Sequence, residues 1–239
     1  MSPIAQDQAY HQFADQNTIF SIPNFWNVIS NLPFILVGII GLVAINRQTI
    51  KGGLAELRIN YSIFFIGLIF TGFGSGYYHW DPNNTSLVWD RLPMTISFMA
   101  FFTAIMGENI SLTLAKRSLY PLLLIGFFSV LYWIMTELNG AGDLRPYVLV
   151  QFLPVIMIPL ILWFYKSSFT GQRYIVAVLL AYVIAKLLEH FDHEVFELFG
   201  VISGHSIKHL VAALGTYFFY LALKKRKLRE IYTVGRGEY

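Results

Sequence analysis

The chain has 239 residues, of which 56% are hydrophobic and only 13% are charged, with a formal net charge of +3. A soluble domain of this length needs a more polar surface, so the composition excludes that class and predicts a membrane protein. The sequence contains no cysteine, which excludes disulfides and thiolate metal sites and leaves His, Asp and Glu as metal ligands. The basic residues lie in short connecting segments and one tail, which argues against nucleic-acid binding.

Seven apolar segments follow a short polar N-terminal segment of about residues 1–24. Crossing a bilayer takes about 20 mostly apolar residues. The segments that meet this length cover residues 25–46, 59–79, 87–107, 118–136, 146–165, 174–190 and 204–223. A basic tail occupies about residues 224–239. We therefore expect a single all-α domain over residues 1–239, folded as a bundle of seven transmembrane helices.

The charges of the connecting segments alternate along the chain. The segments after the first, third and fifth spans carry basic residues, and so does the tail: Arg47, Lys51, Arg58, Lys116, Arg117, Lys166, Arg173 and residues 224–229. The other segments are acidic: Asp7, Asp15, Asp81, Glu137, Asp143, Asp192, Glu194 and Glu197. Because basic segments stay in the cytoplasm, we expect the N-terminus outside and the C-terminus cytoplasmic. The basic tail is expected to contact anionic lipid heads.

Polar residues that could bind a metal ion or transfer a proton lie at the outer ends of three spans. His79 ends the second span, and Ser75 lies one turn deeper on the same helical face. Asp90 falls in the first turn of the third span. His205 and His209 stand at i and i+4 in the first two turns of the seventh span. All five residues are therefore expected within about two helical turns of the outer surface.

Three imidazoles from two helices are typical of a zinc site that leaves its fourth position to water. Zinc lowers the pKa of such a water to about 7. Asp90 is expected to take its proton and later deliver it to a leaving group, and Ser75 to donate a hydrogen bond to a developing oxyanion. For Ser75 taken alone, a hydrogen bond to the carbonyl group at position 71 is the simpler interpretation.

The sixth span supplies competing candidates at the same level. His190 and His193 are alternative metal ligands, although we expect them in a helix end that runs into solvent. Lys186 and Glu189, at i and i+3, are expected to form an ion pair, as charges inside membranes usually do. Lys208 in the seventh span would suit a retinal-binding protein, but it lies near the end of the helix rather than at mid-membrane.

Three motifs resemble those of the alkaline ceramidases, within the CREST superfamily of seven-span hydrolases. They are GSGYYH at 74–79, WDRLPM at 89–94 and GHSIKH at 204–209, and NFWNVISN at 24–31 is similar to the same family. The resemblance extends from about residue 13 to the end of the seventh span. It implies an amidase that cleaves ceramide to a sphingoid base and a fatty acid, with zinc on His79, His205 and His209. It gives Asp90 the acid–base role and Ser75 the oxyanion role.

The resemblance also implies a calcium site before the first span, which in the eukaryotic alkaline ceramidases is acidic. The corresponding segment here reads FADQNTIFSIPNFWN, and its candidate oxygen ligands are Asp15, Asn17 and Asn24. With so few carboxylates, calcium is expected to bind weakly.

Three functions compete at this point. The first is a zinc-dependent amidase acting within the membrane on ceramide or a related N-acyl lipid, with lipid and bilayer as its partners. The second is a seven-span lipid receptor or sensor with a structural zinc, and the third is a zinc lipid esterase of the GPI-remodelling type. In a bacterium, the protein would lie in the inner membrane with its site toward the periplasm.

Overall fold

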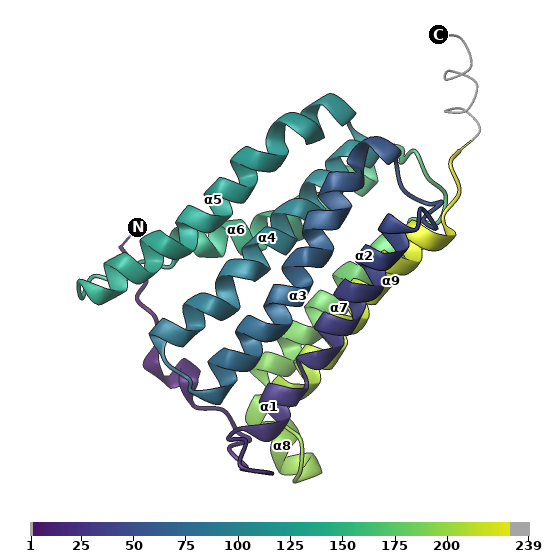
Figure 1. Cartoon of the computed structure of the whole chain (residues 1–239). Coiled ribbons are helices and arrows are strands. Elements are labelled where there is room, and N and C mark those ends of the chain that lie inside the picture. Colours follow the sequence, from purple (N-terminus) through teal and green to yellow (C-terminus); the bar gives the residue numbers. More distant parts are fainter. Residues whose placement is uncertain (1, 230–239) are drawn as a thin grey trace.

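The computed structural model describes residues 2–229, and these fold as a bundle of long helices (Figure 1). The described residues contain no β-strand beyond two isolated bridges, which confirms the all-α prediction. The α-helices are α1 (Phe25–Ile29), α2 (Leu32–Asn46), α3 (Arg58–Trp80), α4 (Asn84–Asn109), α5 (Leu112–Leu138), α6 (Arg145–Phe164), α7 (Arg173–His190), α8 (Asp192–Phe199) and α9 (Gly204–Lys225). Short 3-10 helices are η1 (Gln8–His11) and η2 (Ala55–Leu57).

Several helices are long and apolar enough to cross a membrane, as expected for an integral membrane protein. The five stretches that qualify are Phe25–Asn46, Ala55–Trp80, Leu112–Leu138, Arg145–Phe164 and Gly204–Lys225. A sixth is the pair of α7 and α8, which is bent by 79° at its break. The seven-span prediction therefore depends on α4, which does not qualify by composition.

Helix α4 is less apolar because it carries Asp90, Arg91 and Glu108. It packs against α3, α5 and α6, and most of its residues are buried by them. Charged side chains on a helix in this position face protein rather than lipid, which is the usual arrangement for ionisable groups in membrane proteins.

The main differences from the sequence expectations are three. The first span is interrupted at Ser30 and Asn31, where α1 ends and α2 begins. The fourth begins at Leu112 rather than at residue 118, because Ser111 caps the helix by accepting a hydrogen bond from the backbone of Leu114. The segment after His190 forms the short helix α8 rather than only a loop.

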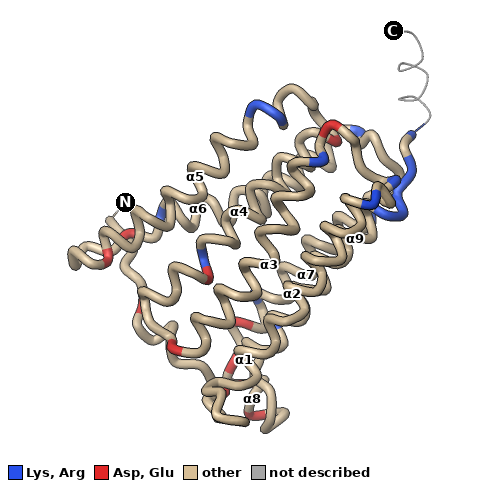
Figure 2. The backbone as a smooth tube through the Cα atoms, viewed as in Figure 1, with Lys and Arg blue, Asp and Glu red and all other residues tan. Residues whose placement is uncertain are grey.

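Charges divide between the two ends of the bundle, as Figure 2 shows. Lys and Arg gather mainly at the end where α2 finishes and α9 finishes, and Asp and Glu gather mainly at the end that carries α1 and α8. This separation follows the alternation of charge along the chain. The orientation of the bundle in a membrane stays a prediction.

The basic tail is only partly as expected. Lys224 and Lys225 are exposed, but Arg226 is 3% exposed and forms an ion pair with Glu108 at 2.7 Å. The prediction of a lipid contact is therefore wrong for Arg226, because the carboxylate of Glu108 on α4 is buried and needs a cation beside it. Residues 230–239 of the predicted tail lie outside the described residues.

Candidate metal centre

Three buried histidines from two helices meet at the acidic end of the bundle. His79 lies in the last turn of α3, and His205 and His209 lie in the first two turns of α9. Their ring centroids are 4.8, 4.9 and 5.0 Å apart, and one ring nitrogen of each lies within 4.8 Å of the others. The structure thus brings together the three residues that the sequence selected as a ligand set.

Two of the three rings are well prepared for a metal ion. Nδ1 of His79 is buried and has no hydrogen-bond partner within residues 2–229, which is costly unless a ligand completes it. Nδ1 of His209 lies 2.8 Å from Oγ of Ser30, which orients the ring and leaves Nε2 free to bind. Zinc–nitrogen bonds of about 2.1 Å would draw the nitrogens closer than they stand here, so binding requires small side-chain rotations.

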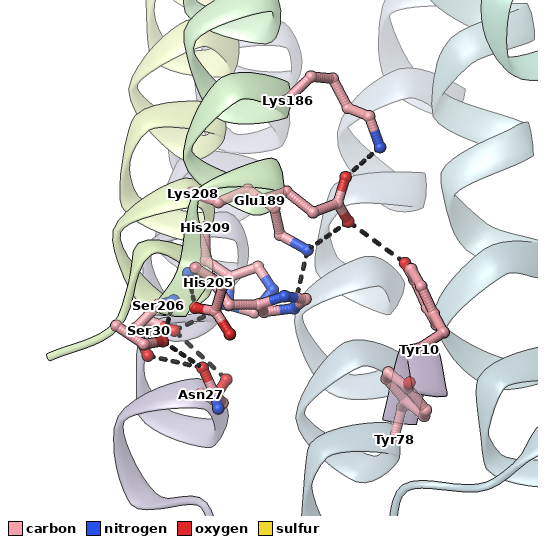
Figure 3. A network of polar contacts seen from close by, with 12 residues as sticks. Tyr10, Asn27, Ser30, Tyr78, Lys186, Glu189, His205, Ser206, Lys208 and His209 are labelled. Carbon is pink, nitrogen blue, oxygen red and sulfur yellow. Dashed lines mark hydrogen bonds and ion pairs between the residues drawn. The ribbon is translucent and has the colours of Figure 1, made fainter. Parts of the chain in front are cut away.

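The third ring has a competing contact. Nε2 of His205 lies 2.8 Å from Nζ of Lys208, and the same ammonium donates to Oε1 of Glu189 at 3.1 Å (Figure 3). A metal ion bound at this nitrogen requires Lys208 to leave the ring and keep Glu189 as its partner. Glu189 also pairs with Lys186, which confirms the expected Lys186–Glu189 ion pair.

Helix α1 is bonded to the start of α9, the helix that carries His205 and His209. Asn27 accepts a hydrogen bond from Oγ of Ser206 at 2.7 Å and donates to the backbone carbonyl of Asp15 at 3.1 Å. Sequence reasoning selected the NFWNVISN stretch only as a resemblance and missed these contacts. A signal was present, because Asn27 and Ser30 lie at i and i+3 on one face of an otherwise apolar segment.

Asp192 is a second residue whose role the sequence analysis missed. Its Oδ1 accepts the backbone N–H of His205 at 2.6 Å, and its Oδ2 accepts that of Ala14 at 2.9 Å. The carboxylate therefore caps the start of α9 and ties the N-terminal segment to it. The neighbouring His190 and His193 are exposed, and neither belongs to the histidine cluster.

The N-terminal segment covers the histidines on the side away from the bundle centre. The ring of Phe13 lies 4.6 Å from that of His79 and 4.7 Å from that of His205, and its side chain is buried. The segment is itself anchored by Tyr10, whose hydroxyl donates to Glu189 at 3.2 Å. The rings of His79 and His205 are consequently screened from bulk water on this side.

The three candidate calcium ligands are only partly assembled. The amide of Asn17 donates to Oδ1 of Asp15 at 2.8 Å, whereas the amide of Asn24 donates to the carbonyl oxygen of His79 at 2.9 Å. Oδ2 of Asp15 is buried, and no described residue forms a hydrogen bond with it. Calcium takes 6–8 oxygen ligands, and this group of side chains falls well short of that number.

Ser75 and Asp90 lie side by side at the polar end of a cavity. A Cβ atom at Gly74 would collide with the carbonyl oxygen of Trp89, so glycine at this position allows α3 and α4 to approach closely. This approach places the hydroxyl of buried Ser75 against the carboxyl group of Asp90. Both residues line the cavity together with His209.

The cavity has a volume of about 280 Å³ and continues from this polar end into an apolar interior. Its lining runs along α4 from Asp90 to Phe101, about three helical turns or roughly 16 Å. This length is about half of the ~30 Å hydrocarbon core of a bilayer. Other apolar lining residues include Phe34, Phe64, Leu68, Val155, Ile158 and Val178. Such a space suits the acyl chain of a lipid.

The likeness to known proteins agrees with this geometry. No curated protein matches the sequence closely enough to count as a relative. The family model described as Ceramidase matches residues 14–231, a range that contains all three histidines together with Ser75 and Asp90. The chain therefore belongs to the Ceramidase family, whose members are hydrolases of the amide bond of ceramide.

Proposed function

We propose that the protein is a zinc-dependent amidase that works within the membrane. It hydrolyses the N-acyl bond of ceramide, or of a related N-acyl lipid, to a sphingoid base and a free fatty acid. The observation that carries this proposal is the cluster of His79, His205 and His209, of which His209 lines the polar end of an apolar cavity of about 280 Å³. The acyl chain would occupy the apolar part and present the amide carbonyl to the cluster.

His79, His205 and His209 would hold the zinc ion, and the buried unpartnered Nδ1 of His79 supports this assignment. When bound, zinc supplies Lewis acidity and lowers the pKa of a bound water to about 7. Ser30 keeps the ring of His209 in place through its Nδ1.

Asp90 and Ser75 perform the proton transfer and the charge stabilisation in this proposal. Asp90 accepts a proton from the attacking water and delivers it to the amine nitrogen as the carbon–nitrogen bond breaks. Ser75 donates a hydrogen bond to the oxygen of the carbonyl group as negative charge develops there. One water is consumed, and a carboxylic acid and an amine are released. The position of both side chains at the cavity supports these roles.

The proposed topology has seven spans in one domain of residues 1–239, with α4 as the span enclosed by its neighbours. The N-terminus lies outside and the C-terminus in the cytoplasm, which the separation of charge in Figure 2 supports. In a bacterium the protein would lie in the inner membrane with the histidine cluster toward the periplasm. Calcium at Asp15, Asn17 and Asn24 is a minor part of the proposal, supported by the unpartnered Oδ2 of Asp15.

The decisive experiment is fatty-acid release by the purified protein in detergent, with and without a zinc chelator. The substrates are ceramides, other N-acyl lipids and acyl esters of glycerophospholipids and GPI lipids. We expect fatty-acid release from the amide substrates, and we expect the chelator to abolish this release. Release from esters alone would support the GPI-remodelling type of esterase instead, and tight lipid binding without any release would support a receptor.

A further inference from the structure

The polar end of the cavity contains more positive than negative side chains. The charged residues in its lining are Arg91, Lys186 and Lys208 against Asp90 and Glu189. Glu189 lies between the two lysines, paired with Lys186 and bonded to Lys208 at 3.1 Å (Figure 3). Glu189 is thus shared by two ammonium groups, and a single carboxylate neutralises only one of their two positive charges.

Arg91 is the more unusual cation. It is 5% exposed, and its guanidinium lies over the rings of Trp133 and Tyr147, with its Cζ at 4.2 and 4.7 Å from their centroids. Nη2 donates to the side-chain oxygen of Gln6 at 2.6 Å, but Nη1 has no partner in the part of the chain that the structure describes. Within residues 2–229, Arg91 forms no ion pair. A buried guanidinium with an open donor is costly, and an anion that reaches it through the cavity would complete it.

Tyr10 lies between Arg91 and the Lys186–Glu189–Lys208 group and contacts both. Its hydroxyl donates to Glu189, and the guanidinium of Arg91 lies 5.8 Å from the centre of its ring. Lys186, on the far side of Glu189, has a side chain that is 37% exposed and is therefore accessible to a ligand. Figure 3 shows Tyr10, Glu189 and Lys186 in this order.

We propose that the substrate is an N-acyl lipid with an anionic group on the amine side of its amide bond, bound by Arg91 and Lys186. The inference rests on the proposed amidase function and narrows its substrate class. The acyl chain lies in the apolar part, the amide lies beside His209, and the anion lies against the open donor of Arg91, with Lys186 on the other side of Glu189. Ceramide itself offers only hydroxyl groups to these cations. Phosphate and carboxylate groups share the geometry that a guanidinium binds best.

Ceramide and ceramide 1-phosphate with the same acyl chain form a matched pair of probes, because they differ only in the phosphate. We expect kcat/KM for ceramide 1-phosphate to exceed that for ceramide by about 10- to 100-fold. Lys186→Gln and Arg91→Gln should each reduce this ratio by about tenfold. Lys166→Gln replaces an exposed lysine in the connection after α6 and should keep the wild-type ratio. A ratio of one or less in the wild-type protein would overturn the proposal.

Binding separates this inference from the amidase proposal. The affinities of both lipids are measured on wild-type and Lys186→Gln protein in detergent, in the presence of chelator so that turnover plays no part. Tighter binding of ceramide 1-phosphate that weakens in Lys186→Gln supports the anion site even if no lipid is hydrolysed. Equal affinities, or a preference that Lys186→Gln leaves unchanged, refute it. Lys186 is partly exposed, so this variant tests the site even if Arg91→Gln does not fold.

Discussion

Two buried polar clusters at opposite ends of the bundle differ in how completely their hydrogen bonds are made. At the basic end, Glu108 accepts from Tyr61 and from both terminal nitrogens of Arg226, and Arg226 also donates to the carbonyl oxygen of Gly52. At the other end, buried atoms of His79, Arg91 and Asp15 have no partner among the described residues; at the basic end the same holds for the side-chain oxygens of Asn60 and Asn109, which take no part in the bonds between Glu108 and Arg226. About 25 Å of α9 separates His209 from Arg226.

This difference distinguishes structural polarity from functional polarity. A buried ion pair with satisfied donors and acceptors holds elements together, whereas an open donor or acceptor costs free energy until a ligand occupies it. The cluster around Arg226 connects α4, α9 and the segment before α3, and it contains no chemistry that a substrate could reach. The other group, here called the open cluster, reaches the cavity through Arg91, which lines it, and through His79, whose ring packs against the cavity-lining His209. Unfilled hydrogen bonds in this place are those expected of a binding site.

The largest expected effect is on catalysis at the open cluster. His209→Ala should abolish zinc binding and lower amide hydrolysis by about 10³-fold or more, because water then keeps a pKa near 15.7 instead of about 7. Zinc content and fatty-acid release measured on the same preparation test this. His190→Ala, which changes an exposed histidine at the same end, is the matched control and should behave as wild type. A zinc-free His209→Ala protein with full activity would refute the assignment.

At the cluster of Glu108 and Arg226, whose hydrogen bonds are all made, the largest expected effect is on stability. Arg226→Met leaves the carboxylate of Glu108 buried without its cation and should lower the free energy of unfolding by about 3–5 kcal/mol. Lys225→Met, at the exposed neighbouring position, should change it little. Thermal unfolding in detergent measures both variants.

The double variant Glu108→Gln/Arg226→Met tests the origin of that loss. Removing both charges should recover much of the stability, because no unpaired charge remains in the interior. If the double variant is as unstable as Arg226→Met alone, the loss comes from packing rather than from the ion pair.

The contrast also explains what the sequence could and could not predict. His205 and His209 share a face through helical periodicity, and the ends of the spans place them level with His79, so the cluster could be found without a structure. Arg226 lies in a run of basic residues that looks like a solvated tail, and nothing local indicates its pairing with Glu108, 118 residues earlier.

The contacts of the N-terminal segment could not be predicted from the sequence either. Phe13 has no periodic pattern around it, and its contact with two histidine rings depends on how an irregular segment folds back across the bundle. Asp192 was counted as one of several outer acidic residues, but it caps α9 only because α7 and α8 bend at that point. Periodicity predicts which residues share a face of a helix, and it does not predict where irregular chain returns to it.

A smaller effect is expected at Ser30, a buried serine whose hydroxyl contacts a ring of the histidine cluster. Ser30→Ala removes the hydrogen bond to Nδ1 of His209 and should weaken zinc affinity by about 10- to 100-fold. Competition with a chromogenic chelator measures the affinity. Ser129→Ala is the matched control, because this buried serine on α5 bonds only to the carbonyl of Gly126 in its own helix. Equal affinities of the two variants would show that Ser30 does not orient the ring.

The smallest expected effect concerns an ion pair with access to water. Asp143 precedes α6, and hydrogen bonds from Arg145 hold the pKa of its carboxyl group well below the usual range. The ionised form therefore stabilises the folded protein fully above about pH 5, and this contribution disappears as the pH falls below the ordinary carboxyl value of about 4. Because Arg145 is partly exposed, solvent screening keeps the contribution small.

Asp143→Asn should accordingly lower the unfolding temperature slightly at pH 7 and by progressively less toward pH 3. A parallel series with Arg226→Met at the same pH values provides the comparison. The deficit of Arg226→Met at pH 7 should be several times larger, because water cannot reach the carboxylate that it leaves unpaired. A deficit of Asp143→Asn that grows as the pH falls would contradict the lowered pKa. A deficit as large as that of Arg226→Met would remove the distinction between a screened pair and a buried one.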